Sequence, residues 1–155
     1  MRGVMVAAVL VASIVGAAAE ERFGRWKVHR SVDKFDGLAR VVASTAQGGA
    51  MLAARCIGKM PGLAIGVRLQ RSALRSGDAI KLRLRVDDGR VFDLQAFHLG
   101  NDAFQVAQRI EVWEALERGK VAAVRVIGDG EVVDLDFGLD GAAAAIDRVR
   151  AACFR

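Results

Sequence analysis

The sequence lacks the motifs that usually carry enzyme chemistry, and it has few residues that hold metals. Its two histidines, His29 and His98, and its two cysteines show no metal-ligand spacing. No Gly-x-Ser-x-Gly, Gly-x-Gly-x-x-Gly or phosphate-loop signature is present, so the common hydrolase and nucleotide-binding motifs are missing. The absence of a Cys-x-x-Cys pair argues against thiol redox chemistry. We therefore expect a protein that is not an enzyme and that needs no cofactor and no metal.

Aspartates offer an alternative to that expectation. Asp87 with Asp88, or the group at Asp134, Asp136 and Asp140, could supply the acid and base of an envelope hydrolase. Local structure accounts for the same residues, because aspartate favours turns, solvent-facing strand positions and helix N-caps. We expect these structural roles, with Asp88 in a turn, Asp134 and Asp136 on the solvent side of a strand, and Asp140 as a helix cap.

A strong excess of one charge is also missing. The net charge is +5 over 155 residues, and the basic residues are dispersed, so nucleic-acid binding is not indicated. A weak attraction to anionic cell-wall polymers or lipid head groups is an alternative use of this charge. The chain has no low-complexity tail, internal repeat or linker, and its length suits one domain with its own core.

The N-terminus has the pattern of a secretion signal. Arg2 precedes an apolar run at 4–15, and small residues then lead to Ala19 and the acidic Glu20. The run is shorter than the roughly 18 residues of a spanning helix, although an uncleaved anchor is the alternative. We expect cleavage after Ala19, which leaves one periplasmic domain over residues 20–155 without a transmembrane segment.

Export bears directly on the two cysteines. In an oxidising compartment, Cys56 and Cys153 are expected to form a disulfide, because two thiols in one exported domain are normally oxidised. Closing a loop of about 97 residues is worth roughly 4–5 kcal/mol in the chain-entropy model. The alternatives, a redox pair or a metal pair, are disfavoured by the wide spacing and by the lack of clustered histidines.

Strand signals dominate the chain. In residues 79–87, apolar and mostly charged positions alternate strictly, which predicts a half-buried antiparallel strand. Asp88-Gly89 then predicts a hairpin with residues 90–97, and a Gly-Asp-Gly turn predicts a second hairpin. The strands of that hairpin are expected at 121–127 and 131–137. Further strands are expected at 25–30, 38–43, 50–56 and 63–69, with turns at Gly48-Gly49 and Pro61-Gly62.

Two segments have helical patterns. Residues 109–118 place Ile110, Trp113 and Leu116 on one side, and residues 141–153 combine four alanines with a C-terminal pair of arginines. The expected fold is α+β, with a mostly antiparallel sheet or sandwich of about eight strands. One internal helix and a C-terminal helix complete it, and one disulfide fixes it.

One surface is a candidate for binding. Lys81, Arg83 and Arg85 project from the same face of the strand at 79–87. Such a face suits an anionic ligand or an acidic partner, although basic residues on a strand also serve as a plain solvated face that discourages aggregation. We treat these three residues as the candidate partner- or anion-binding face.

Several segments together resemble a known family. These segments are Trp26, the Asp33/Asp36 region, Arg55-Cys56, Arg85-Val86-Asp87 and the ending from Phe137 to Cys153. The pattern resembles the VasI/TagO family of small exported proteins associated with type VI secretion in Gram-negative bacteria. The resemblance implies a conserved disulfide between Cys56 and Cys153 and carries over no catalytic residue. A weaker likeness is to the invasion-associated locus B proteins, which are also exported and β-rich.

These observations favour a non-catalytic accessory or binding protein of the bacterial envelope, associated with a secretion system and in contact with an envelope protein. The alternative is a periplasmic domain that binds a small ligand or inhibits an enzyme, similar to the invasion-associated locus B proteins.

Overall fold

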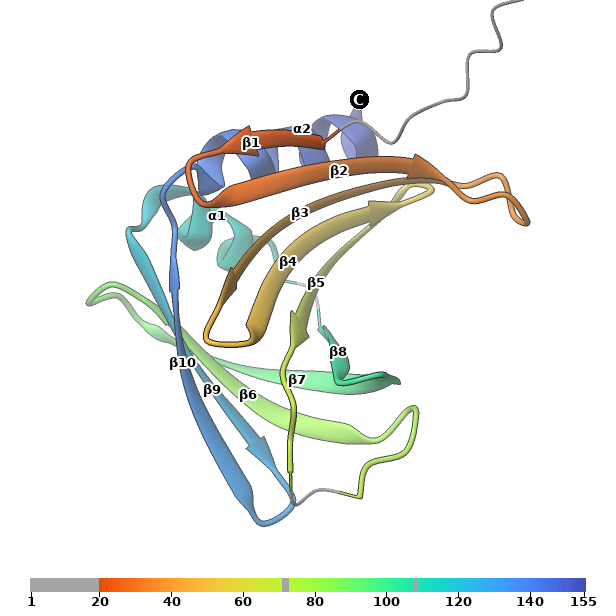
Figure 1. The fold of residues 1–155 in the computed structure, drawn as a ribbon. Helices are drawn as coiled ribbons and strands as arrows, with labels where there is room; N and C mark the ends of the chain where they lie inside the picture. Colours follow the sequence, from red (N-terminus) through yellow and green to blue (C-terminus); the bar gives the residue numbers. More distant parts are fainter. Residues whose placement is uncertain (1–19, 71–72, 108) are drawn as a thin grey trace, which may run out of the picture.

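A computed structural model describes residues 20–70, 73–107 and 109–155, and the predicted secretion signal at 1–19 lies outside them. The described chain forms one antiparallel sheet of ten strands with two helices (Figure 1). The strand order across the sheet is β1-β2-β3-β4-β5-β8-β7-β6-β9-β10. The strands are β1 (Glu20–Phe23), β2 (Trp26–Val32), β3 (Ala39–Gln47), β4 (Ala50–Ile57), β5 (Met60–Gly66), β6 (Ala79–Val86), β7 (Val91–Gly100), β8 (Ala103–Val106), β9 (Val121–Gly128) and β10 (Glu131–Gly138). The helices are α1 (Ile110–Arg118) and α2 (Ala142–Phe154).

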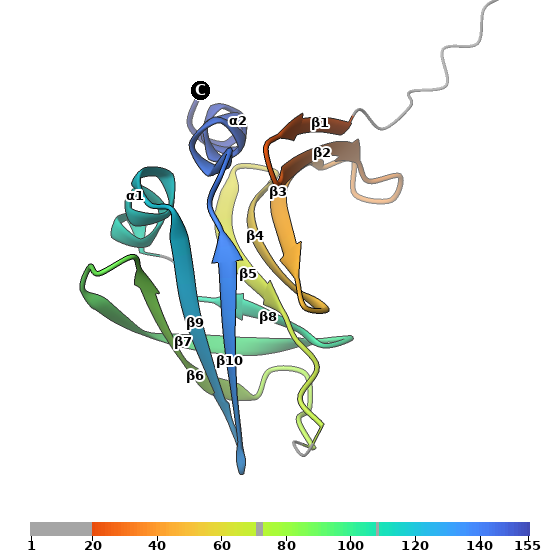
Figure 2. The same cartoon turned by 60° about the vertical axis from the view of Figure 1, so that its left-hand side comes forward.

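The sheet is bent, so that its two halves face one another across the core (Figures 1 and 2). The halves are β1 to β5 and β6 to β10, and they are joined where β5 pairs with β8 through only four residue pairs. Both helices lie at one end of the molecule, where α2 packs on β2, β3 and β4 and also contacts α1 (Figure 2). Among the described residues, no helix is long and apolar enough to cross a membrane.

Strict alternation decides which side chains fill the core. In β6, Ile80, Leu82, Leu84 and Val86 are buried, whereas the residues between them are exposed. The same inward face recurs on neighbouring strands because antiparallel pairing aligns every second residue. The apolar side of α2, which includes Ile146 and Val149, completes this core.

The first and last parts of the chain are tied together. The indole Nε1 of the fully buried Trp26 donates to the carbonyl of Gly138 at 3.2 Å. The backbone N–H of Arg25 donates to the carbonyl of Asp140 at 3.1 Å. Because these contacts join the start of β2 to the end of β10, the two edge regions of the sheet meet beside α2.

The structure corrects the expected number of strands. The two hairpins, the four earlier strands and both helices are confirmed within a few residues, but the sheet has ten strands rather than eight and is not a sandwich of two sheets. The missed strands, β1 and β8, have four residues each and show no extended apolar alternation.

The turn expected at Pro61-Gly62 is wrong. Pro61 lies inside β5, where it pairs with Cys56, and the preceding turn instead uses Gly58, whose φ is 61°. A proline is tolerated there because the pairing of β5 with β8 begins only at Leu63, so the missing N–H breaks no bond on that side.

The helix cap expected at Asp140 is also wrong. The N-cap of α2 is Gly141 in a left-handed conformation with φ 86°, and no side chain caps the helix. A Cβ at this position would collide with the backbone of Phe23, so only glycine fits. The carbonyl of Asp140 instead accepts the hydrogen bond from Arg25.

Candidate functional site

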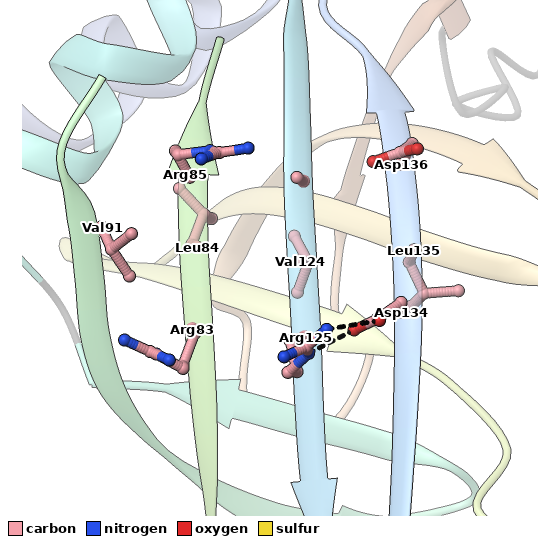
Figure 3. A pocket seen from close by; sticks show the side chains of 10 residues that line it. Arg83, Leu84, Arg85, Val91, Val124, Arg125, Asp134, Leu135 and Asp136 are labelled. Atoms are coloured by element: carbon pink, nitrogen blue, oxygen red, sulfur yellow. Dashed lines mark hydrogen bonds and ion pairs between the residues drawn. The ribbon is translucent and has the colours of Figure 1, made fainter. Parts of the chain in front are cut away.

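A groove crosses the outer face of four neighbouring strands, β7, β6, β9 and β10 (Figure 3). We call it the charged groove, and its volume is about 440 Å³. It is open to solvent because its walls are the outward side chains of a bent sheet whose inward side chains form the core. Its lining residues are Arg83, Leu84, Arg85, Val91, Ala123, Val124, Arg125, Asp134, Leu135 and Asp136.

One row of charges across the groove is fully paired. Register places Asp93, Arg83, Arg125 and Asp134 side by side on the four strands. The two arginines are direct neighbours, and each reaches to the aspartate on its other side. Arg83 Nε lies 2.8 Å from Asp93 Oδ1, and Arg125 binds both carboxylate oxygens of Asp134 at 2.6 and 2.7 Å (Figure 3).

The pair of Arg125 and Asp134 shifts both ionisation equilibria. The hydrogen bond from Arg125 lowers the pKa of Asp134, and the attraction of the guanidinium adds to this effect. The same hydrogen bond and charge raise the pKa of Arg125. Both groups therefore stay charged over a wide pH range, and the row is a fixed feature of the face.

The next row along the strands is unpaired. It consists of Val91, Arg85, Ala123 and Asp136. Among the residues that the structure describes, Arg85 and Asp136 have no hydrogen-bond or ion-pair partner, and neither has Lys81, which lies on the other side of the paired row. The small side chain of Ala123 separates Arg85 from Asp136, so a cationic wall and an anionic wall face each other across an open space (Figure 3).

Two residues of the predicted candidate face, Arg83 and Arg85, form one wall of the groove, and Lys81 lies outside its lining. Lys81, Arg83 and Arg85 all project outward from β6, as the alternation predicted. Sequence reasoning missed that Arg125 and Asp136 belong to the same surface. The signal was present, because they lie at outward positions of the second hairpin, but only the pairing of β6 with β9 brings the two hairpins together.

Two of the candidate acids of a hydrolase, Asp134 and Asp136, line the charged groove, and Asp87 is engaged by backbone groups. Asp87 follows β6, and its carboxylate accepts the backbone N–H groups of Lys120 at 3.1 Å and Val121 at 2.9 Å. Asp134 is bound by Arg125, across the sheet. Asp87 thus has a structural role, whereas the local roles expected from the sequence were those of Asp88, Asp134, Asp136 and Asp140.

The two histidines lie on different strands. His29 is exposed on β2, and His98 on β7 packs against the ring of Phe104 with centroids 5.1 Å apart. Within the described ranges, no group of three or more histidine, cysteine or acidic residues is arranged to hold a metal.

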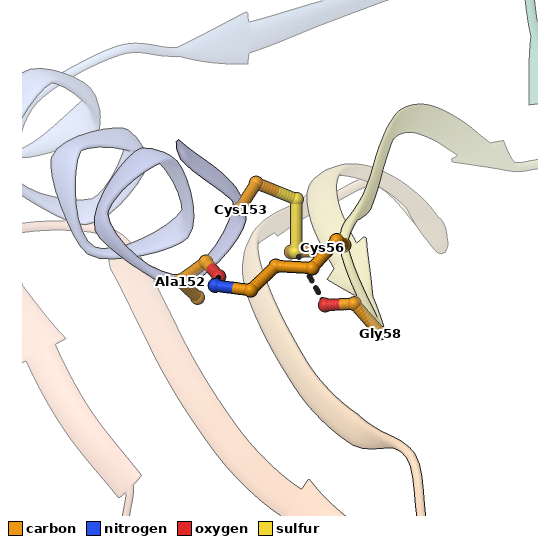
Figure 4. The surroundings of a disulfide bond; sticks show 5 residues. Cys56, Gly58, Ala152 and Cys153 are labelled. Atoms are coloured by element: carbon orange, nitrogen blue, oxygen red, sulfur yellow. Dashed lines mark hydrogen bonds between the residues drawn. A yellow bond between two sulfur atoms is a disulfide. The ribbon is translucent and has the colours of Figure 1, made fainter. Parts of the chain in front are cut away.

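The predicted disulfide is present. Cys56, near the end of β4, is bonded to Cys153, in the last turn of α2, with Cα atoms 5.7 Å apart (Figure 4). Beside it, Lys59 Nζ donates to the carbonyl of Ala152 at 2.9 Å. The bond joins the C-terminal helix to the first half of the sheet, away from the charged groove.

Comparisons with known proteins give a fold but no family. No model of a known protein family matches the chain, and no curated protein sequence matches it. Among solved structures, the fold is similar to the crystal structure of invasion associated protein B from Bartonella henselae. That match has a TM-score of 0.59 and 16% identity, and it covers 86% of this chain and 97% of the other. The similarity shows a shared fold and nothing finer.

Proposed function

We propose that this protein is an exported, non-catalytic binding protein of the bacterial cell envelope, and that the charged groove contacts an envelope protein. The observation that carries the proposal is the unpaired row beside the paired one. The paired row holds its charges in place, whereas Arg85 and Asp136 have charges that no described neighbour satisfies.

The arrangement defines the chemistry of the partner. Arg85 lies on β6 and Asp136 on β10, two strand spacings apart, or about 10 Å. A partner surface that places a carboxylate over β6 and a basic group over β10 would match both walls. Charge complementarity of this kind sets orientation and speeds encounter more than it adds affinity.

The disulfide and the predicted secretion signal support the assignment to an oxidising compartment. Structural disulfides persist outside the cytoplasm and are rare within it. The periplasm remains our proposal, as does an association with type VI secretion, which rests on the resemblance to the VasI/TagO family.

A second candidate is a binding domain for a small zwitterionic ligand, which one feature of the groove favours. Its volume of about 440 Å³ lies in the range of ligand sites, roughly 300–1,000 Å³. The anionic group of such a ligand would bind Arg85 and its cationic group would bind Asp136. The fold similarity to invasion associated protein B is compatible with this alternative.

Site-specific cross-linking in the native cells tests the first proposal. A photoreactive amino acid replaces Val91 at the rim of the groove or, as the control, Met51 on the outer face of β4; both side chains are about equally exposed, at 44% and 42%. We expect a discrete cross-linked protein from position 91 and not from position 51.

A charge reversal then tests the groove itself. Arg85→Glu should abolish the cross-link from position 91, whereas Arg68→Glu, a charge reversal at an exposed site outside the groove, should leave it unchanged. If no protein is cross-linked but a zwitterionic compound raises the melting temperature in an Arg85-dependent way, the ligand-binding alternative is favoured. Cross-linking that persists in Arg85→Glu would refute the groove as the contact.

A further inference from the structure

The last strand of the sheet leaves one of its edges unpaired. β10 ends the strand order, and it is the outermost of the four strands that carry the charged groove (Figure 3). It is eight residues long, contains no proline or lysine, and pairs with β9 without a bulge. Natural edge strands are usually short or carry such features, because unpaired backbone groups invite another strand. The opposite edge strand, β1, follows that rule, since it has only four residues.

The register identifies the backbone groups on the unpaired edge. Glu131 and Gly128 flank a two-residue turn, so they form a hydrogen-bonded pair. Every second residue of β10 from Glu131 onward therefore bonds to β9, and the residues between them direct their N–H and C=O groups away from it. These residues are Val132, Asp134, Asp136 and Gly138.

One end of this edge already accepts donors from another part of the chain. The carbonyl of Gly138 accepts the indole N–H of Trp26 at 3.2 Å. The carbonyl of Asp140, just beyond β10, accepts the backbone N–H of Arg25 at 3.1 Å. The other residues of the edge receive no backbone bond from another described segment, and we call them the open edge. The open edge comprises Val132, Asp134 and Asp136.

The core is also incomplete beside the open edge. Val133 and Leu135 lie on the inward side of β10 but are only partly buried. Their partners on β9, Val126 and Val124, are 0% and 2% exposed. A further strand beside β10 would cover the two partly buried side chains with its own inward residues. Burial of apolar area therefore favours a strand with apolar residues at alternate positions.

The outward side of β10 selects the charge of that strand. Asp134 is bound by Arg125, whereas Asp136 has no partner among the described residues. A second copy of this chain, paired antiparallel over the middle of the open edge, would bring aspartates of the two copies together, which is unfavourable. A strand with a basic residue opposite Asp136 gains a cross-strand ion pair instead. The charges therefore favour a different protein over a second copy.

We propose that an extended segment of a partner protein adds to the open edge as a further strand, with basic residues facing outward and apolar residues facing the core. Main-chain hydrogen bonds would hold the segment, and its alternate side chains would select it. This inference rests on the proposed function, because it states how the envelope partner binds. It adds a backbone contact to the side-chain contacts of the charged groove.

A labelled synthetic peptide in which lysine and valine alternate is the probe, and fluorescence anisotropy measures its binding to the purified protein. We expect saturable binding, and weaker binding of a peptide with glutamate in place of lysine. Val133→Lys places a charge on the core side of the edge and should lower the affinity about tenfold. Val32→Lys, the same change at an exposed site on β2, should have no effect. Melting temperatures show whether both variants are folded.

A proline variant tests the edge without changing any charge. Val132→Pro removes an N–H of the open edge and no bond to β9, so it should preserve the fold and lower the affinity of the peptide about tenfold. Amide hydrogen exchange then locates the contact. The peptide should slow exchange at Asp134 and Asp136, whereas the amides of Val133 and Leu135 are already bonded to β9 in the free protein. Contact through groove side chains alone would not produce this alternation.

Two results would overturn the inference. The first is that the alternating peptide does not bind, or binds without slowing exchange at the open edge. The second is a cross-link from position 91, in the native cells, that is lost in Arg85→Glu but persists in Val132→Pro. That second result would leave the groove contact standing, whereas failure of the proposed function itself shows as a cross-link that is absent or that persists in Arg85→Glu.

Discussion

The end of the molecule covered by α2 and the outer face that carries the charged groove differ in burial and in how their charges are paired. At the α2 end, apolar side chains such as Ile146 are fully buried and a disulfide joins helix to sheet. Its arginines are engaged, since Arg148 binds Glu21 and Arg150 binds Glu117. In the groove, charges stand in solvent, and Arg85 has no described partner.

The two regions therefore differ in role: the α2 end stabilises the fold, whereas the groove contributes little to stability and is available for recognition. Burial and a covalent link stabilise the fold, whereas exposed ion pairs contribute little to it. Substitutions of charged residues in the groove should therefore leave the protein folded, whereas substitutions in the packed α2 end should destabilise it. Substitutions in the two regions should accordingly differ in what they alter.

The largest effect should come from the disulfide. Replacing both cysteines, in Cys56→Ala/Cys153→Ala, should lower the free energy of unfolding by roughly 4–5 kcal/mol, because the unfolded chain loses a long cross-linked loop. Denaturant unfolding measures this, and the wild type under reducing conditions should match the double variant. An unchanged midpoint would show that α2 is held by packing alone.

The next largest effect should come from the buried face of α2. Ile146→Ala should cost about 2–5 kcal/mol, because it leaves a cavity beneath the helix. The exposed Ala144→Gly on the same helix should cost about 1 kcal/mol through helix propensity alone. Equal losses in chemical denaturation would mean that α2 contributes by its backbone rather than by its core contacts.

Acid should weaken the protein through particular carboxylates. The pKa of Asp33 lies below its ordinary 3.8, chiefly because the carboxylate accepts the N–H groups of Phe35 and Asp36, and that of Asp134 is lowered by Arg125. A lowered pKa in the folded state adds stability above the ordinary value and loses it as pH falls through the folded value.

The corresponding variants should lose that dependence. The melting temperatures of Asp33→Asn and Asp134→Asn should lie below wild type at neutral pH, and the gap should close below about pH 4. Thermal unfolding across pH 2 to 7 measures it. A gap that is constant with pH would mean that the carboxylate charge is not the cause.

The smallest effect on stability should come from the unpaired wall of the groove. Arg85→Ala should change the free energy of unfolding by no more than about 0.5 kcal/mol, as expected for an exposed side chain without a partner. Denaturant unfolding of this variant beside Ile146→Ala gives the contrast directly. A loss above 1 kcal/mol would assign Arg85 a structural role and would weaken the case for recognition.

Local sequence patterns predicted those strands and turns whose formation follows from a single local rule. Period-two alternation located β6, and glycine-rich turns located both hairpins, because these signals depend only on neighbouring residues. The short β1 carries no such pattern and is held by its pairing with β2. Before β8, Asn101 and Asp102 form a two-residue turn with positive φ at both positions, and asparagine and aspartate are residue types that favour such hairpin turns.

One wall of the groove could be predicted from the sequence and the other could not, because a local pattern describes only its own strand. The wall on β6 follows from one strand, so Arg83 and Arg85 could be grouped from the sequence, together with Lys81 on the same strand face. The opposite wall depends on β9 joining the two hairpins, which are separated in sequence by β8 and α1. Alternation assigns a side chain to a face of its own strand, but it does not say which strands are neighbours.

The contact between Trp26 and Gly138 also determines when the chain can fold. The start of β2 needs the end of β10, and Cys56 needs Cys153, so the core has no complete boundary until the last residues of the chain are available. Contacts so distant in sequence are formed slowly, because loop closure precedes any gain. A chain of this topology therefore cannot close its core until its C-terminal helix has been synthesised.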